Sequence, residues 1–371
     1  MKIFILHSYF YLFMSLLCPL FGSNTLQKAP INPPTNFNSF INIVDFLPEN
    51  FVKDGTIDYT STIQSLIDNN TNLLFPPFPL LVNEKGLNLR SNSVLYFPKG
   101  GCIKMKPNNS SHYSILHIEN IQNIRIYNAV LIGDRKNHLG SSGEWGMGIY
   151  IKGAENIYIT NAVISDCWGD GIDIMHSSDK NNSKNIFIEK CKIMRNRRNG
   201  ITIGSGEDIT IANCIISDTN GTLPMAGIDI EPNNNKAELG KIKIENLKTS
   251  SCRIGIQLGL SRYPSHKKRK INITIDNFES FTDEHGLLIG DYYRAHQYEP
   301  GIKKLTGTVS FSNIIINDSK NDPIKYYSQY GYEYGPNTIF KNIKIKNKGK
   351  LMESKGIKNN LKIRKFNIDQ F

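Results

Sequence analysis

Four carboxylic acids gather around two similar short segments of the sequence. Asp173 lies in Gly-Ile-Asp-Ile and Asp229 in a second Gly-Ile-Asp-Ile, with Asp170 just before the first segment and Glu231 just after the second. Cleavage of a glycosidic bond by acid–base chemistry needs two carboxyl groups, because one protonates the leaving oxygen while the other activates water. Like charges held close together raise the pKa of at least one of them. This pattern predicts Asp173, Asp229 and Asp170 as catalytic residues; the alternative is that outward-facing acids only solvate a surface.

Aromatic residues accompany the acids. The segment 133–148 carries His138, Glu144 and Trp145, and Trp168 lies in the turn before the first acidic segment. Sugar rings stack well on indole faces, and these are the two tryptophans of the chain. We therefore expect all four residues to contact a substrate. The alternative is that the two tryptophans pack on each other and plug a turn.

Three arginines lie between the acidic segments, at positions 195, 197 and 198. Guanidinium groups bind carboxylates in a bidentate manner, so Arg197 and Arg198, with Glu231, are predicted to bind the substrate, and an acidic glycan is favoured. The alternative is a surface ion network in which the arginines neutralise the nearby aspartates.

An internal repeat must position these residues. Segments of the form Gly-Ile-x-Ile, with leucine at some isoleucine positions, begin at residues 148, 171, 200, 227, 255 and 286. Short strands that alternate isoleucine with polar residues lie between them, separated by Asn, Gly, Ser and Asp. Repeats of 20 to 50 residues with β-branched strands and glycine turns are typical of a parallel β-helix, a solenoid in which each turn, or rung, adds one strand to each sheet.

The repeat places one side chain per rung on the outer face. The residue between the two apolar positions is Tyr150, Asp173, Thr202, Asp229, Gln257 and Leu288 in successive rungs. Asp173 and Asp229 are thus expected on one face, two rungs or roughly 9.5 Å apart. This separation is near the upper end for an inverting glycosidase pair.

The N-terminal region has a different character. Residues 1–23 resemble a secretory signal peptide, which predicts a secreted or periplasmic protein without stable membrane insertion after signal removal; a retained anchor or lipidation are the alternatives. Residues 24–44 are expected to be a flexible lead-in, and 45–371 a single β-helix domain in which 45–100 form the cap and the first rungs. Asp54-Gly-Thr and the following residues to Ile67 predict a short amphipathic capping helix, with Asp58 or Thr60 as its cap.

At this point the sequence resembles a known superfamily. Asp54-Gly-Thr, Thr62-Ile63-Gln64 and a later Phe-Pro strand are similar to the start of pectate-lyase-like right-handed parallel β-helix proteins. Asn196-Arg-Arg-Asn-Gly-Ile201 and Ala226-Gly-Ile-Asp-Ile-Glu-Pro-Asn233 resemble segments of secreted members. The resemblance covers roughly residues 45–290 and implies an all-β, single-stranded right-handed parallel β-helix. It implies function only broadly, since the fold serves lyases, hydrolases, epimerases and tailspike depolymerases.

The amino-acid composition limits the possible fold classes and binding partners. The chain has 371 residues and a formal charge of +11, from 44 Lys and Arg against 33 Asp and Glu, with 39% hydrophobic residues. This excludes disorder, collagen and coiled coil. The acids mixed into the candidate face argue against a nucleic-acid partner. The cysteines show no CxxC spacing, so no transition-metal site is expected. The residues imply no cofactor, although the resemblance allows calcium, which lyase members often use.

The sequence therefore predicts a secreted, polysaccharide-active β-helix enzyme, a hydrolase or a lyase, acting on an acidic, uronic-acid-containing glycan. The alternative is a non-catalytic glycan-binding or adhesive solenoid. The sequence contains no complete active-site signature of the superfamily's lyases, polygalacturonases or epimerases, and it leaves the oligomeric state open.

Overall fold

The structure is a computed structural model that describes residues 32–179, 181–233, 236–261, 263, 266–290, 301, 303–326, 335–351 and 367–369. The predicted signal peptide lies outside the described residues. The chain divides into a segment ending at Asn36 and a unit from Phe37 to Phe371, and the helices and strands found among the described residues lie in this second unit.

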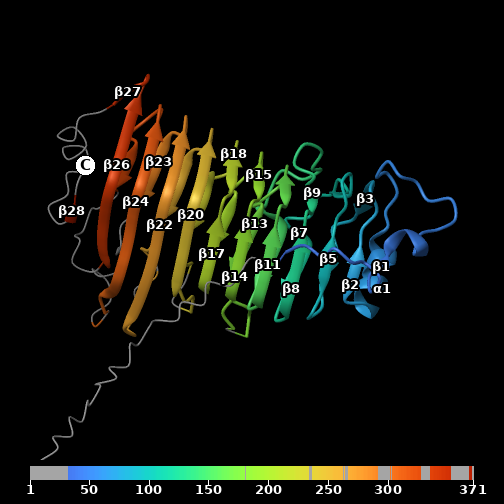
Figure 1. The fold of residues 1–371 in the computed structure, drawn as a ribbon. Helices are drawn as coiled ribbons and strands as arrows, with labels where there is room; N and C mark the ends of the chain where they lie inside the picture. The colour runs from blue at the N-terminus through green and yellow to red at the C-terminus, as the bar shows by residue number, and fades with distance from the viewer. Residues whose placement is uncertain are drawn as a thin grey trace, which may run out of the picture. The chain divides into compact units, whose positions relative to one another are not determined.

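One sheet is built from the predicted Gly-Ile-x-Ile segments and their neighbours. Among the described residues its nine strands pair in chain order, all parallel. Figure 1 shows the rungs of the solenoid following one another along the chain. They are β4 (Leu87–Asn88), β7 (His112–Glu119), β10 (Trp145–Lys152), β13 (Ile172–Met175), β16 (Ile201–Ile203), β19 (Ala226–Ile230), β21 (Ile254–Leu258), β23 (His285–Ile289) and β25 (Ile324–Tyr326). We call this the acidic sheet, because β13 and β19 carry Asp173 and Asp229.

The remaining strands complete each rung. One column pairs β2 (Asn72–Leu74), β5 (Val94–Tyr96), β8 (Gln122–Tyr127), β11 (Glu155–Thr160), β14 (Lys184–Glu189) and β17 (Glu207–Ala212), and β1 (Ile41–Asn42) adds to β2. A second pairs β3 (Pro79–Val82), β6 (Cys102–Met105), β9 (Val130–Ile132), β12 (Val163–Ser165), β15 (Lys192–Met194) and β18 (Ile215–Ser217). Both columns end at β20 (Lys241–Ser250), a long strand that pairs with β17 and with β18. The parallel strands that follow it are β22 (Arg269–Phe281), β24 (Leu305–Asn317), β26 (Asn337–Asn347) and β28 (Asn367–Asp369). Strand β27 (Lys350–Leu351) pairs antiparallel with β26. This arrangement confirms the predicted parallel β-helix.

The core is a stack of aliphatic ladders. Ile149 pairs with Ile172, which pairs with Ile201, and the ladder continues through Ile228 and Ile256, each at most 1% exposed. Because side chains alternate across a strand, burying these isoleucines turns the residue between each pair outward. The repeat alignment read from the sequence is therefore the register of the structure.

Asparagines make the tight turns between strands. Asn128, Asn161, Asn213, Asn246 and Asn277 all have positive φ, between 52° and 58°. Asparagine tolerates this left-handed conformation better than most residues. Its side-chain amide also bonds along the stack, for example from Asn161 to Asn128 at 3.2 Å and from Asn246 to Asn213 at 3.0 Å.

The glycine that opens each Gly-Ile-x-Ile segment is required by close packing. A Cβ atom at Gly200 would overlap the side chain of Ile216 in the core and lie 2.5 Å from the carbonyl oxygen of Gly227 in the next rung. Gly171 and Gly227 are equally confined by their neighbours. The repeated glycine is thus explained by the approach of neighbouring rungs.

We predict that Gly200→Ala lowers the free energy of unfolding by about 1–3 kcal/mol, the usual cost of overpacking a filled core. Gly259→Ala is the matched control, because its Cβ would meet only ordinary contacts from 3.4 Å outward, and its effect should stay within about 0.5 kcal/mol. Urea unfolding followed by circular dichroism measures both. Equal effects of the two substitutions would contradict the packing explanation.

The predicted capping helix is present. Helix α1 spans Thr60–Asn69 and buries Ile63, Leu66 and Ile67. The N-cap residue is Tyr59, which makes no side-chain capping hydrogen bond, so the expectation of Asp58 or Thr60 at this position is wrong by one residue. Asp58 precedes the cap, and its carboxylate accepts hydrogen bonds from the Thr60 backbone N–H at 3.0 Å and from its hydroxyl at 2.5 Å. A short 3-10 helix, η1 (Ile43–Phe46), precedes it. In the described part of the chain, no helix has the length and apolar character needed to span a membrane.

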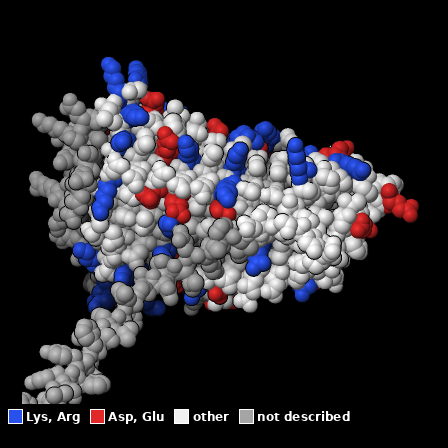
Figure 2. Space-filling model, in the orientation of Figure 1, with Lys and Arg blue, Asp and Glu red and all other residues white. Residues whose placement is uncertain are grey.

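The positive charge is dispersed. On the face shown in Figure 2, Lys and Arg side chains are interspersed with Asp and Glu and do not merge into one basic patch. The net charge of +11 therefore says little about a partner.

Candidate functional site on the acidic sheet

A ladder of polar side chains runs along the outer face of the acidic sheet. His117 pairs with Tyr150, which pairs with Asp173, and the ladder continues through Thr202 to Asp229. Asp173 and Asp229 share this face two strands apart, as the repeat predicts. Their exposure is low, however, at 6% for Asp173 and 0% for Asp229. Outward orientation does not place these carboxyl groups in open solvent.

Asp170 is the buried anchor of the site. It accepts hydrogen bonds from Arg198 Nη1 at 2.8 Å, the Asn199 backbone N–H at 2.9 Å and the Thr202 hydroxyl at 2.7 Å. These donors occupy both carboxylate oxygens of a residue with no exposed surface. Asp170 therefore holds the loop 197–199 against the sheet, an arrangement that leaves it no free oxygen for a substrate.

Asp173 differs from Asp170 in its environment. Its Oδ1 atom is buried and makes no hydrogen bond within the described part of the chain. Burial, together with the negative charge of Asp170, raises the pKa of Asp173 to about 8, while Arg198 acts in the opposite direction. A carboxyl group in this state holds its proton at neutral pH and can donate it.

Asp229 is closed off by amides. Asn199 Nδ2 donates to its Oδ2 at 3.3 Å and Gln257 Nε2 to its Oδ1 at 3.0 Å. Burial and the charge of Glu231 raise the pKa of Asp229 well above its ordinary value. Glu231 lies just past the end of β19, two residues after Asp229, and is only partly buried. Of these two carboxyl groups, Glu231 is the one that solvent reaches.

The segment 133–148, which we call the inserted segment, reaches the acidic cluster. The Glu144 carboxylate lies 3.9 Å from Arg198 Nε, and the Gly169 N–H donates to the carbonyl of Gly146 at 2.7 Å. Arg197 Nη1 donates to the carbonyl of Gly143 at 2.7 Å. The end of this segment is thus fastened to the turn that carries Asp170.

Trp168 lies between two other side chains. The imidazole of His138 stacks on it at 4.0 Å between centroids, and the Arg197 guanidinium lies 3.9 Å from its ring centre. Two groups at this distance occupy opposite faces of the indole, so no face is left for a sugar. His138 also bonds through Nδ1 to Asp134 at 2.8 Å, and its side chain is fully buried. His138 therefore packs the base of the inserted segment without an exposed side chain, whereas Trp168 stays partly exposed and its two ring faces are already occupied.

Trp145 is the accessible tryptophan. It is 44% exposed and stacks on His112 at 4.3 Å between centroids. The stack covers one indole face and leaves exposed area for a ligand. The two tryptophans have different ring partners, so the structure does not bear out their mutual packing as turn plugs.

Two of these arginines already bind carboxylates of the protein itself. Arg195 binds Asp166 through two nitrogens at 3.1 and 2.7 Å, and Arg198 binds Asp170. These pairs match the ion-network alternative, and a uronic-acid carboxylate would have to compete with them.

A polar group next to Asp173 escaped the sequence reasoning. Glu119 accepts from His117 Nε2 at 3.0 Å and forms an ion pair with Lys152 Nζ at 2.8 Å. Tyr150 lies one strand from Asp173, and burial, Asp173 and Glu119 all raise its pKa. Strand β7 carries Ile115 where the repeat has glycine, which hid this rung from the Gly-Ile-x-Ile pattern.

The calcium allowed by the resemblance finds no support in side-chain geometry. Among the described residues, no group of three or more His, Cys, Asp or Glu side chains is arranged to hold a metal ion.

The raised pKa of Asp173 makes stability depend on pH. In the folded state the group keeps its proton up to about pH 8, whereas in the unfolded state it ionises near pH 4. The folded state therefore binds more protons across this window, and the free energy of unfolding falls as pH rises through it. We expect Asp173→Asn to flatten this slope. Urea unfolding between pH 4 and 8 measures it, with Asp322→Asn, an exposed acid, as control; equal slopes in wild type and Asp173→Asn would contradict the assignment.

Comparison with known proteins identifies the class of fold. The family model of the right handed beta helix region matches residues 101–262. Together with the parallel rungs, this gives the fold as a right-handed parallel β-helix, and the fold expected from the resemblance is confirmed.

Its relatives include two proteins of Bacillus subtilis (strain 168). The uncharacterized protein YclG is 39% identical over 145 residues, which cover 35% of this chain and 25% of YclG. The SPbeta prophage-derived uncharacterized protein YorA is 30% identical over 209 residues, 52% of this chain and 35% of YorA. The chain thus spans 25% to 35% of the length of these relatives.

Solved structures share the fold at low sequence identity. The N-terminal fragment of bacteriophage phi29 gene product 12 has a TM-score of 0.60 at 18% identity, covering 82% of this chain and 57% of that one. The polygalacturonase from Erwinia carotovora ssp. carotovora has a TM-score of 0.57 at 14% identity, covering 86% and 95%. The tailspike protein of E. coli bacteriophage HK620, solved in complex with a pentasaccharide, has a TM-score of 0.54 at 12% identity, covering 82% and 53%.

Proposed function

We propose that this chain is a secreted polysaccharide-active protein that hydrolyses a glycosidic bond on the outer face of the acidic sheet. The observation that carries the proposal is the Asp173 carboxyl group, which is slightly exposed and has its pKa raised to about 8. Support comes from proteins of the same fold whose names refer to polysaccharides, a polygalacturonase and a tailspike bound to a pentasaccharide.

In this proposal Asp173 is the general acid. It transfers its proton to the glycosidic oxygen as the bond to the anomeric carbon breaks, so the leaving sugar departs as a neutral alcohol. Glu231 is the carboxylate that accepts a proton from the attacking water, because it is partly exposed and follows the second acidic segment. Asp229, enclosed by Asn199 and Gln257, keeps a positioning role. Trp145 offers the exposed ring on which a neighbouring sugar stacks.

Hydrolysis is favoured over elimination by the state of the cations. A lyase must neutralise a uronate carboxylate before its base removes a proton, and arginine or a metal ion usually does so. Here Arg197 contacts Trp168 and the Gly143 carbonyl, and Arg198 binds Asp170. An acidic glycan remains within the proposal, but its charge would have to displace an existing partner.

The decisive experiment incubates the purified protein with a panel of neutral and acidic polysaccharides. New reducing ends without the ultraviolet absorbance of an unsaturated sugar are expected. Reducing ends together with that absorbance would establish elimination and refute hydrolysis.

A second candidate is a non-catalytic glycan-binding protein. The observation that favours it is the burial of the acids, since Asp229 is fully enclosed and Asp173 is 6% exposed. It predicts that the panel yields no product while oligosaccharides still bind, and that Asp173→Asn leaves their affinity unchanged.

A further inference from the structure

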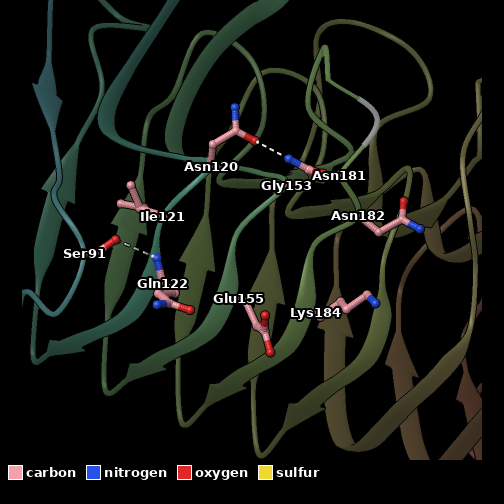
Figure 3. Close-up of a pocket in the computed structure, with 9 residues that line it drawn as sticks. All are labelled: Ser91, Asn120, Ile121, Gln122, Gly153, Glu155, Asn181, Asn182 and Lys184. Carbon is pink, nitrogen blue, oxygen red and sulfur yellow. Dashed lines mark hydrogen bonds between the residues drawn. The ribbon is translucent and has the colours of Figure 1, made fainter.

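A hollow of about 550 Å³ lies away from the acidic cluster. Figure 3 shows it where strands of the acidic sheet turn into β8, β11 and β14. None of the residues predicted from the sequence to act on a substrate lines it. The residues that line it are Ser91, Asn120, Ile121, Gln122, Gly153, Glu155, Asn181, Asn182 and Lys184.

One wall of the hollow is held in place by a glycine. Gly153 has a φ of +56°, and a Cβ atom there would lie 2.7 Å from Ser177 Cβ and 2.9 Å from both Asn120 Oδ1 and the Asn181 carbonyl oxygen. Asn181 Nδ2 in turn donates to Asn120 Oδ1 at 3.3 Å, a contact drawn in Figure 3. The Ser177 backbone N–H also donates to the Asn181 carbonyl at 2.9 Å. The wall is therefore formed before any ligand arrives, which reduces the ordering cost of binding.

Amide groups with unused hydrogen-bonding capacity face this space. The Gln122 side-chain amide has no partner in the described part of the chain. Asn182 Oδ1 accepts from the Ser205 hydroxyl at 2.8 Å, which leaves both of its N–H groups available. An amide donates and accepts at once, as a sugar hydroxyl does, so the two can pair in either direction.

The charges of the hollow balance. Glu155 and Lys184 are opposite each other on neighbouring strands, so one acid and one base line the hollow, and Lys184 Nζ forms an ion pair with the Glu207 carboxylate at 3.8 Å. No uncompensated cation is left among the lining residues to attract an acidic group. Ile121, partly buried against the core, adds an apolar surface for the C–H face of a sugar ring.

We propose that this hollow binds a neutral, hydroxyl-rich saccharide unit. The amides recognise its hydroxyl groups and Ile121 contacts its apolar face. Glu155 selects against a uronic acid, because the one lining lysine, Lys184, already pairs with Glu207. Asn120 and Gly153 directly follow Glu119 and Lys152 at the ends of β7 and β10, so the hollow adjoins the strands next to the proposed cleavage site. The binding itself does not depend on the proposed function.

The test is calorimetric titration of the full chain with four probes: cellohexaose, maltohexaose, mannohexaose and hexagalacturonate. At least one neutral hexasaccharide is expected to bind more tightly than hexagalacturonate. Gln122→Ala combined with Asn182→Ala should weaken that affinity by roughly tenfold, the effect of about two lost hydrogen bonds. Gln122→Ala alone, which removes no internal contact, should give an intermediate loss in a correctly folded protein.

One control separates this proposal from a general effect of removing a surface amide. Asn50→Ala removes an exposed amide far along the chain from the hollow and should bind like wild type. The proposal fails if no neutral probe binds, if hexagalacturonate binds most tightly, or if the Gln122 and Asn182 variants bind as well as wild type. Failure of the cleavage assay alone leaves all these readouts intact.

Discussion

Asp173→Asn is expected to lower the rate of polysaccharide cleavage by about 10²–10⁴-fold, the usual contribution of a general acid. Asparagine keeps the size of the side chain but has no transferable proton. The change should not unfold the protein, since Asp173 Oδ1 makes no hydrogen bond in the described part of the chain and the carboxyl group is protonated at neutral pH. Reducing-end release from the best polysaccharide of the panel measures the rate, and Asp322→Asn serves as the control.

A second substrate separates acid from base. An aryl glycoside of the same sugar has a good leaving group that needs little protonation, so the Asp173→Asn defect should shrink on it. The Glu231→Gln defect should persist, because activation of water is still required. Equal defects of Asp173→Asn on both substrates would show that Asp173 is not the general acid.

The fold was predictable because most rungs of the solenoid use the same short sequence pattern, a glycine followed by two inward-facing apolar residues. Each glycine before an isoleucine pair marks a place where rungs approach too closely for a Cβ, and the steps between Gly148, Gly171 and Gly200 set the register directly. The shared face of Asp173 and Asp229 followed from strand alternation alone. Strand alternation and the glycine spacing depend on residues close together in the chain, so both can be predicted from the sequence.

Burial at the site was not predictable by the same means. Alternation indicates that a side chain points outward, but not what lies over it. Asp229 is covered by Asn199 and Gln257, and Trp168 is enclosed by His138 and Arg197. These partners come from different rungs and from an insertion, so their contacts depend on loop conformations that no repeat specifies. The hollow beside Gly153 escaped notice for the same reason, since its wall comes from the loop before β14.

Arg198→Met is expected to lower the free energy of unfolding by about 3–5 kcal/mol, the cost of removing one partner of a buried ion pair. Arg198 is 14% exposed and Asp170 is fully buried, with 2.8 Å between Nη1 and Oδ2. Arg195→Met is the matched control, because Arg195 binds Asp166 at 2.7 Å but is 44% exposed and Lys136 also pairs with Asp166. Its effect should be about 0–1 kcal/mol. Urea unfolding at neutral pH measures both variants.

The double variant Arg198→Met, Asp170→Asn identifies the source of the loss. If the cost of Arg198→Met is the unpaired Asp170 carboxylate, removing that charge restores much of the stability, because the asparagine carbonyl still accepts the Asn199 N–H or the Thr202 hydroxyl. If the cost is lost packing of the arginine side chain, the double variant is no more stable than Arg198→Met.

The Asp170–Arg198 pair also acts on Asp173, since Asp170 raises the pKa of Asp173 and Arg198 lowers it. Arg198→Met alone should therefore raise the pKa of Asp173 further and extend the pH-dependent loss of stability to higher pH. The double variant removes both charges, so the upper pH of that loss should move back down.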